Sequence, residues 1–151
     1  MTPNEHRSST LTQLGLTAQG ARDATVTSIV LDSRQVMPGA LFAALPGTAV
    51  HGATFVEIAI SNGAAAILTD SEGAAIVEPA IKGTDVVLVV AQDVRQTLAQ
   101  TAALWFGPQP ETAVAVTGTN GKTSVSTFCR MIWNELELEA VNLGTTGVEG
   151  S

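Results

Sequence analysis

The stretch AVAVTGTNGKTSVSTF, residues 113–128, joins an apolar run to a glycine-containing loop and a Gly-Lys-Thr tripeptide. The small apolar residues predict a buried strand over 112–117, and apolar residues at helical spacing after the loop predict a helix over 122–139. A short strand is expected at 140–143. Strand, loop, helix and strand in this order predict a βαβ unit, which is typical of an α/β fold.

The loop TGTNGKTS, residues 117–124, has the residue types that bind a phosphate group. Gly118 and Gly121 would let the backbone approach an anion where a side chain would collide. The N-terminus of the following helix directs amide groups and the positive end of its dipole at the same place. Lys122 would contact the β- and γ-phosphates of ATP, and the Thr123 hydroxyl would ligate Mg²⁺.

Three further residues of the loop, Thr119, Asn120 and Ser124, can add backbone or side-chain donors. The usual phosphate-loop pattern, G-x-x-x-x-G-K-[ST], is matched only in its second half, because Val116 stands at the first glycine position. A tight strand-to-helix turn with a solvated Lys122 is the structural alternative. The apolar strand before the loop and the helix after it favour nucleotide binding.

The residues before this unit also alternate between predicted strands and helices. Strands are expected within 24–34, 37–45, 64–69 and 85–93, helices within 8–16, 55–61 and 93–106, and a turn-rich connection over 71–85. The segment GPQPET, residues 107–112, is the predicted linker because it holds two prolines among polar neighbours. We therefore expect two domains, residues 1–108 and 109–151.

The composition is that of a folded, acidic protein. Hydrophobic residues make up 45% and charged residues 14% of the 151 residues, so the chain can bury a core. The net charge of -7 argues against a sequence-independent nucleic-acid-binding protein, which needs clustered lysine and arginine. Cys129 is the only cysteine, and neither His6 nor His51 has partners at metal-ligand spacing. Without a signal peptide or membrane span in the sequence, we expect a cytoplasmic monomer with no nucleic-acid or membrane partner.

Two separated motifs resemble the Mur ligases, which are ATP-dependent amide-bond-forming enzymes of peptidoglycan precursor synthesis. VAVTGTNGKTS, residues 114–124, resembles their ATP-binding loop, which lacks the leading glycine. LDSRQVMPGALFAALPG, residues 31–47, resembles the signature of their N-terminal uridine-nucleotide-binding domain. VNLGTTGV, residues 141–148, is similar to a segment of the tripeptide-forming (MurE-type) members. The resemblance covers about residues 25–150.

The resemblance implies an α/β fold in which a small N-terminal domain binds the uridine nucleotide and the βαβ unit begins a truncated central ATPase domain. It implies a ligase that adds the third amino acid, meso-diaminopimelate or alternatively L-lysine, to UDP-N-acetylmuramoyl-L-alanyl-D-glutamate. ATP would phosphorylate the substrate carboxylate to an acyl phosphate, which the incoming amine attacks. The loop and Mg²⁺ would orient the triphosphate and offset its charge.

The resemblance also implies roles for individual residues of this chain. Leu31 and Ser33 match positions that contact the UDP-sugar substrate. Thr48, Ala49 and Val50 match a loop that closes on the uracil end of that substrate. Gly118 to Ser124 match the ATP loop, with Lys122 as the catalytic residue on the phosphates and Thr123 as the metal ligand.

Other interpretations remain open at this point. A dipeptide-adding (MurF-type) ligase shares this type of N-terminal domain, and a non-catalytic fragment that binds a UDP-sugar or ATP without turnover is a different class of function. Asp32-Ser33-Arg34 can equally be a strand-end turn that Asp32 caps. The rest of the ATPase domain and the amino-acid-binding domain do not lie within 151 residues, so we expect the chain alone to be inactive.

Overall fold

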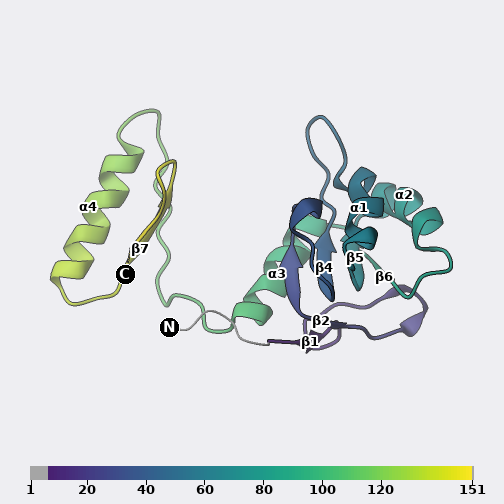
Figure 1. The fold of residues 1–151 in the computed structure, drawn as a ribbon. Helices are drawn as coiled ribbons and strands as arrows, with labels where there is room; N and C mark the ends of the chain where they lie inside the picture. Colours follow the sequence, from purple (N-terminus) through teal and green to yellow (C-terminus); the bar gives the residue numbers. More distant parts are fainter. Residues whose placement is uncertain (1–6, 151) are drawn as a thin grey trace. The chain divides into compact units, whose positions relative to one another are not determined.

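The computed structural model describes residues 7–150, so His6 and Ser151 lie outside the described residues. The chain divides into two compact units between Gln109 and Pro110 (Figure 1). Each unit is described by itself below. No helix in the part of the chain that the structure describes is long and apolar enough to cross a membrane.

A parallel sheet of four strands forms the centre of the first unit. Its strands are β3 (Ser28–Val30), β4 (Ala40–Ala43), β5 (Ala66–Thr69) and β6 (Val87–Val90), in the order β3-β4-β5-β6. In this register Phe42 lies opposite Val30 on one side and Ile67 on the other. The expected α/β class is therefore confirmed, and these strands lie within the predicted ranges.

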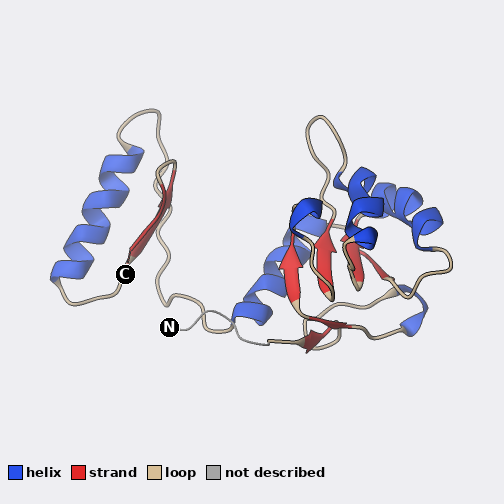
Figure 2. Cartoon of the chain, in the orientation of Figure 1, coloured by secondary structure: helices blue, strands red, loops and turns tan. Residues whose placement is uncertain are grey.

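Both faces of this sheet are covered, which parallel strands require (Figure 2). Successive side chains of a strand point to opposite faces, so Phe42, Ile67 and Leu88 belong to one buried cluster. That cluster includes residues of α1 (Val56–Ser61) and α2 (Ser71–Ile81). The alternate residues Leu41 and Leu68 belong to a second cluster, with Trp105 of α3 (Val94–Phe106).

Helix α2 was not expected from the sequence. The prediction of a turn-rich connection over 71–85 is wrong, because residues Ser71–Ile81 form a helix despite Gly73 and the internal Pro79. Asp70 caps this helix by accepting a hydrogen bond from the Gly73 amide at 2.8 Å. Ala74 and Val77 are buried against the sheet, and this burial outweighs the weak local helix propensity.

The N-terminal segment also differs from expectation. The predicted helix within 8–16 is wrong: β1 (Ser9–Thr10) pairs antiparallel with β2 (Thr25–Val26), and a tight turn follows β1. Leu11, Leu14 and Leu16, the leucines of this segment, are nevertheless buried in the second cluster. Three short 3₁₀ helices complete the unit: η1 (Gln19–Ala21), η2 (Ser33–Gln35) and η3 (Gly52–Phe55).

The second unit contains α4 (Lys122–Glu135) and a hairpin of β7 (Val141–Gly144) and β8 (Gly147–Gly150). The predicted helix begins at the expected residue but ends four residues early, because Glu137 adopts a positive φ of 60° that stops it. The expected strand over 112–117 is not formed. A strand needs a hydrogen-bonded neighbour, and within residues 110–150 the ladder pairs only β7 with β8.

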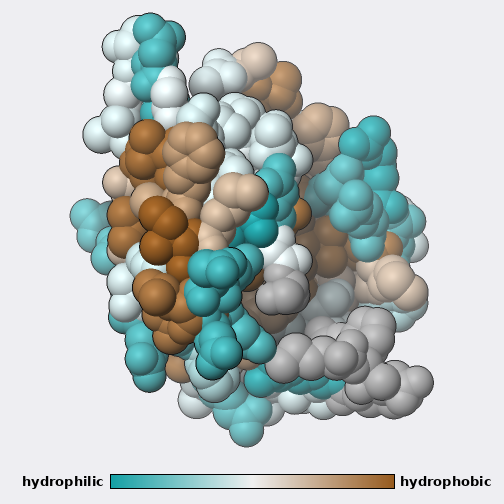
Figure 3. Space-filling view, turned by 90° about the vertical axis from the view of Figure 1, so that its left-hand side faces the viewer, coloured by the Kyte–Doolittle hydropathy of each residue, from teal (hydrophilic) through white to brown (hydrophobic). Residues whose placement is uncertain are grey.

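No residue of α4 is buried. Its apolar residues Val125, Phe128 and Ile132 are 47%, 61% and 59% exposed. Figure 3 shows exposed hydrophobic surface on the side of the molecule that faces left in Figure 1. The helix therefore has the predicted apolar stripe, but the second unit does not cover it.

Candidate functional site

The glycine loop leads into α4 through two backbone conformations that favour glycine. Gly118 has a φ of 147° and Gly121, the N-cap of α4, has a φ of 78°. No side chain of the described part of the chain caps this helix, whereas Asp70 caps α2 and Asp93 caps α3. The amides of the first turn of α4 are thus left without a side-chain acceptor, as a helix end that binds an anion requires.

Lys122 folds back over the loop that precedes it. Its Nζ donates hydrogen bonds to the carbonyl oxygen of Gly118 and, at 3.3 Å, to that of Thr119. The ammonium group therefore contacts the backbone of the loop. All seven predicted loop residues, Gly118, Thr119, Asn120, Gly121, Lys122, Thr123 and Ser124, are exposed, so the loop surface is open to a ligand.

A cavity of about 780 Å³ adjoins this loop in the second unit. Lys122 and Thr123 contribute to its lining together with residues 112–116 and β7. Asn142 of β7 is only 5% exposed, and its Nδ2 has no hydrogen-bond partner among residues 7–150. The cavity lining is thus mostly apolar, and it includes the two loop residues that are expected to contact phosphate and metal.

The predicted substrate residues of the first unit lie at the carboxyl ends of β3 and β4. Leu31 follows β3 and is 57% exposed, and Ser33 is buried at the start of η2. Thr48, Ala49 and Val50 lie in the β4–η3 loop, residues 44–51, and all three are exposed. Because β3 and β4 are parallel neighbours, both groups follow strand ends at one edge of the sheet, where α/β folds bind ligands.

Asp32 and Arg34 form a local ion pair around Ser33. Arg34 donates from its backbone amide to Asp32 Oδ1 at 3.0 Å and from its guanidinium to both carboxylate oxygens. The Arg34 side chain, then its backbone amide, lowers the pKa of Asp32 to about 2. The same pairing raises the pKa of Arg34. The geometry thus agrees with the interpretation of residues 32–34 as a turn that Asp32 caps. Arg34 is paired with Asp32 in this turn.

His51 and Asp70 are a pair that sequence reasoning missed. His51 Nε2 lies 3.1 Å from Asp70 Oδ1, and its Nδ1 accepts a hydrogen bond from the Ala53 amide at 3.0 Å. The Gly73 amide and then the His51 side chain lower the pKa of Asp70 against the opposing effect of burial. The two residues are 19 positions apart, and no local pattern signals their contact.

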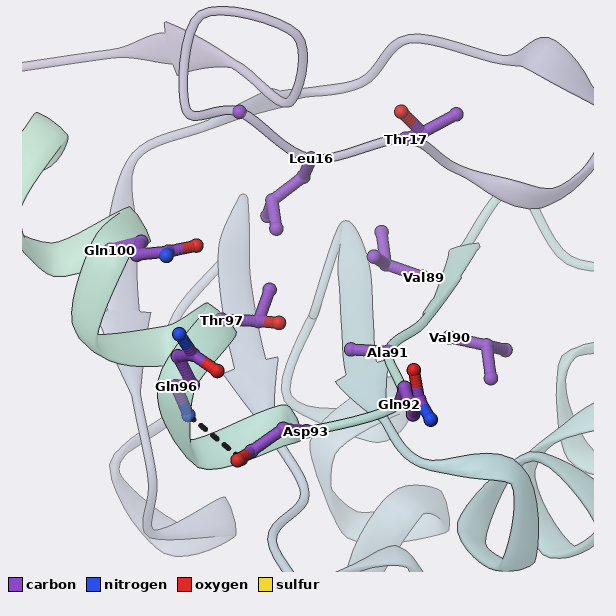
Figure 4. Close-up of a pocket in the computed structure, with 11 residues that line it drawn as sticks. Leu16, Thr17, Val89, Val90, Ala91, Gln92, Asp93, Gln96, Thr97 and Gln100 are labelled. Carbon is purple, nitrogen blue, oxygen red and sulfur yellow. Dashed lines mark hydrogen bonds between the residues drawn. The ribbon is translucent and has the colours of Figure 1, made fainter.

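A second cavity, of about 630 Å³, lies at the far edge of the same sheet (Figure 4). Leu16 and Thr17, the end of β6 and the first turns of α3 line it. Its polar side chains come mainly from Gln92, Gln96 and Gln100, and Asp93 is engaged in capping α3 at 2.9 Å. No residue predicted to bind substrate lines this cavity.

Comparison with known proteins relates these features to one group of enzymes. Over 128 residues the chain is 47% identical to the UDP-N-acetylmuramoyl-L-alanyl-D-glutamate–2,6-diaminopimelate ligase of Caulobacter vibrioides, covering 85% of this chain and 25% of that protein. The ligase of the same name from Zymomonas mobilis is 39% identical over 147 residues, covering 93% of this chain and 29% of that protein. The chain thus spans about a quarter of the length of the curated relatives it matches.

Solved structures agree with the sequence relatives. A structure of a UDP-N-acetylmuramoyl-L-alanyl-D-glutamate–2,6-diaminopimelate ligase matches with a TM-score of 0.69 at 27% identity, covering 95% of this chain and 29% of the other. A MurF ligase from Thermotoga maritima in complex with ADP matches with a TM-score of 0.51 at 26% identity, over 72% of this chain and 23% of the other. The pattern described as "Mur ligase family, catalytic domain" matches residues 25–106, more than half of the chain. This chain belongs to the Mur ligase family.

Proposed function

We propose that this chain is the N-terminal part of an ATP-dependent ligase that adds 2,6-diaminopimelate to UDP-N-acetylmuramoyl-L-alanyl-D-glutamate. The observation that carries the proposal is the 47% identity to a curated ligase of that name over 85% of the chain. The alignment with the Zymomonas mobilis ligase covers 93% of this chain, so it leaves out fewer residues than follow Ser124. That alignment therefore includes the glycine loop.

In this proposal the second unit binds the triphosphate of ATP. The uncapped first turn of α4 supplies amide donors, and the glycines at 118 and 121 keep the backbone accessible, since a Cβ at Gly121 would meet no atom within 4 Å. Lys122 exchanges the carbonyls of Gly118 and Thr119 for the phosphates, and Thr123 offers its hydroxyl to Mg²⁺. The loop residues therefore fit both groups, and Mg²⁺ would supply charge neutralisation between the phosphates.

The reaction joins a carboxylate to an amine. A carboxylate oxygen of the substrate takes the γ-phosphoryl group of ATP, and the bond between that group and ADP breaks. The amine nitrogen then forms a bond to the carbonyl carbon and gives up a proton to the medium, and inorganic phosphate leaves with the C–O bond electrons. Residues 118–124 act by holding and neutralising the phosphates, so their contribution is orientation and electrostatic stabilisation.

The first unit binds the uridine-diphosphate end of the substrate. Leu31 and Ser33 after β3, and Thr48 to Val50 after β4, form this region at one edge of the sheet. Leu31 and Val50 are 57% and 53% exposed, so they leave apolar surface available to a uracil ring. These roles follow the two domains expected from the sequence, residues 1–108 and 109–151, and the two compact units meet one residue later, between Gln109 and Pro110.

The proposal is tested on a protein in which this chain is extended to the full length of its relatives. That protein should release phosphate from ATP only when UDP-N-acetylmuramoyl-L-alanyl-D-glutamate and meso-diaminopimelate are both present. L-lysine in place of diaminopimelate tests the third-residue choice, and the tripeptide substrate with D-alanyl-D-alanine tests the MurF-type alternative. Turnover only with the tripeptide substrate and D-alanyl-D-alanine would show a MurF-type reaction in place of the proposed one. The absence of turnover with every substrate pair would favour a protein that binds nucleotides without catalysis.

A further inference from the structure

We propose that His51 is a positioning residue: together with Asp70 it holds the β4–η3 loop in the conformation that binds the uridine diphosphate. The proposal rests on the function proposed above, in which Thr48 to Val50 contact the uracil end. His51 is the last residue of this loop and Asp70 is the first residue after β5. The pair therefore joins the loop to the neighbouring strand of the sheet.

The imidazole of His51 uses both nitrogens. Because Nδ1 accepts the Ala53 amide hydrogen at 3.0 Å, the ring proton resides on Nε2 and is donated to Asp70 Oδ1 at 3.1 Å. The side chains of His51 and Asp70 are only 14% and 19% exposed. A partly buried, charge-assisted hydrogen bond of this kind is stronger than one on the open surface.

The ring fits a space that the surrounding residues keep clear. A Cβ at Gly73 would lie 2.6 Å from Cε1 of His51 and 2.0 Å from Oγ1 of Thr69. Thr69 is itself fully buried and donates to the Ala44 carbonyl at 2.9 Å, at the start of the same loop. The pair is thus part of a network that connects both ends of the loop to β5 and α2.

Two further contacts restrain the base of the loop and leave its tip free. The Gly52 amide donates to the Leu45 carbonyl at 2.8 Å, which closes the loop. Arg95 of α3 donates from Nη2 to the Pro46 carbonyl at 2.8 Å. Residues 47–50, which include all three predicted uracil-loop residues, are exposed.

A loop with a fixed base and a free tip loses less conformational entropy when a ligand binds. Each side chain or segment that is ordered in advance lowers the cost of association. His51 therefore raises the affinity for uridine diphosphate without touching it. The proposed role is distinct from metal binding, since no cluster of three or more His, Cys, Asp or Glu side chains among residues 7–150 could hold a metal ion.

The test uses two substitutions that each remove only the contact between the two residues. His51→Asn keeps an acceptor for the Ala53 amide but is too short to reach Asp70, and Asp70→Ser keeps a cap for α2 but no carboxylate for His51. Titration of the 151-residue chain with UDP by calorimetry should show about tenfold weaker binding for each. The double variant should be no weaker than either, because both remove the same interaction.

Asp93→Ser is the matched control, because it makes the same aspartate-to-serine change at the cap of α3 and alters neither His51 nor Asp70. It should leave the UDP affinity unchanged even if it lowers stability. Amide relaxation measured by NMR should show residues 47–50 more mobile in the His51 and Asp70 variants than in the control. Unchanged affinity and unchanged loop mobility in both variants would overturn the proposal. A parent chain that binds no UDP at millimolar concentration would overturn the proposed function and the role of the loop, whereas the relaxation data would still decide whether the pair orders it.

Discussion

The backbone of Gly73 passes so close to the imidazole of His51 that a Cβ at position 73 would lie 2.6 Å from the ring atom Cε1. Thr69 Oγ1 would be closer still, at 2.0 Å. A glycine inside α2 is therefore the condition for bringing the β4–η3 loop against β5. A glycine usually destabilises a helix, but at position 73 it avoids these two close contacts.

Gly73→Ala should destabilise the chain. In an exposed helix the same change stabilises by about 0.5–1 kcal/mol, but here the added methyl group must displace His51 or Thr69, at a cost of about 1–3 kcal/mol. Urea unfolding followed by circular dichroism measures the difference. Glu78→Ala, at an exposed position of the same helix, is the control and should change stability little. A more stable Gly73→Ala variant would show that the close contact is absent.

The ion pair of Asp32 and Arg34 predicts a measurable acid titration. The folded pKa of Asp32, about 2, is below its ordinary value. A lowered folded pKa stabilises the folded state above the ordinary pKa of the carboxyl group, and the contribution is lost as the pH falls toward 2. The Asp32 carboxyl carbon signal should titrate with a midpoint near 2 in an NMR pH series.

Arg34→Gln separates the two causes of this shift. It removes the guanidinium, which is the largest cause, but retains the backbone amide that also donates to Asp32. The Asp32 midpoint should therefore rise only part of the way to its ordinary value. A midpoint that does not move would mean that the side-chain pair does not form in solution.

Asp93 should contribute to stability through the cap of α3. Its carboxylate accepts the Gln96 amide at 2.9 Å, and the helix that begins there supplies the buried Trp105. Asp93→Ala should cost about 1 kcal/mol in urea unfolding, because the amide loses its acceptor. Asp93→Ser retains an acceptor and should recover most of that loss. Equal stability of the Ala and Ser variants would argue against the cap.

Lys122→Ala should reduce ATP-dependent ligation by about 100-fold or more in the full-length protein, since it removes a positive charge from the developing charge on the phosphates. Phosphate release and product formation measure this. Lys82→Ala makes the same change at the other lysine of this chain, which is exposed at the end of α2, and should leave the rate unchanged. Retained turnover in the Lys122 variant would remove the role given to that lysine.

Elements with strong local signals followed from the sequence. Apolar runs placed β4, β5 and β6, and the helix predicted within residues 93–106 is α3. The glycine loop and the start of α4 at Lys122 were likewise visible, because a Gly-Lys-Thr tripeptide before a helical pattern is a local feature. Residue spacing alone carries such information, since each signal depends on neighbours in the chain.

Other features depended on contacts between distant residues. The helix α2 forms around Gly73 and Pro79 because Ala74 and Val77 are buried on the sheet. The leucines at 11, 14 and 16 cover the opposite face from a turn instead of a helix. Residues 112–117 carry an apolar strand pattern, yet no neighbouring strand pairs with them within residues 110–150. A strand is a property of two segments, so one segment's sequence cannot decide it.

The amino-acid sequence by itself determined the α/β class of the first unit, the phosphate-loop motif and the resemblance to the Mur ligases. Only the tertiary structure decided that His51 contacts Asp70, that Arg95 holds Pro46, and that a glycine must stand at 73. The physical reason is separation along the sequence, because patterns of burial and capping involve residues that are only a few positions apart. The loop's restraints join side chains that meet only after the sheet has assembled.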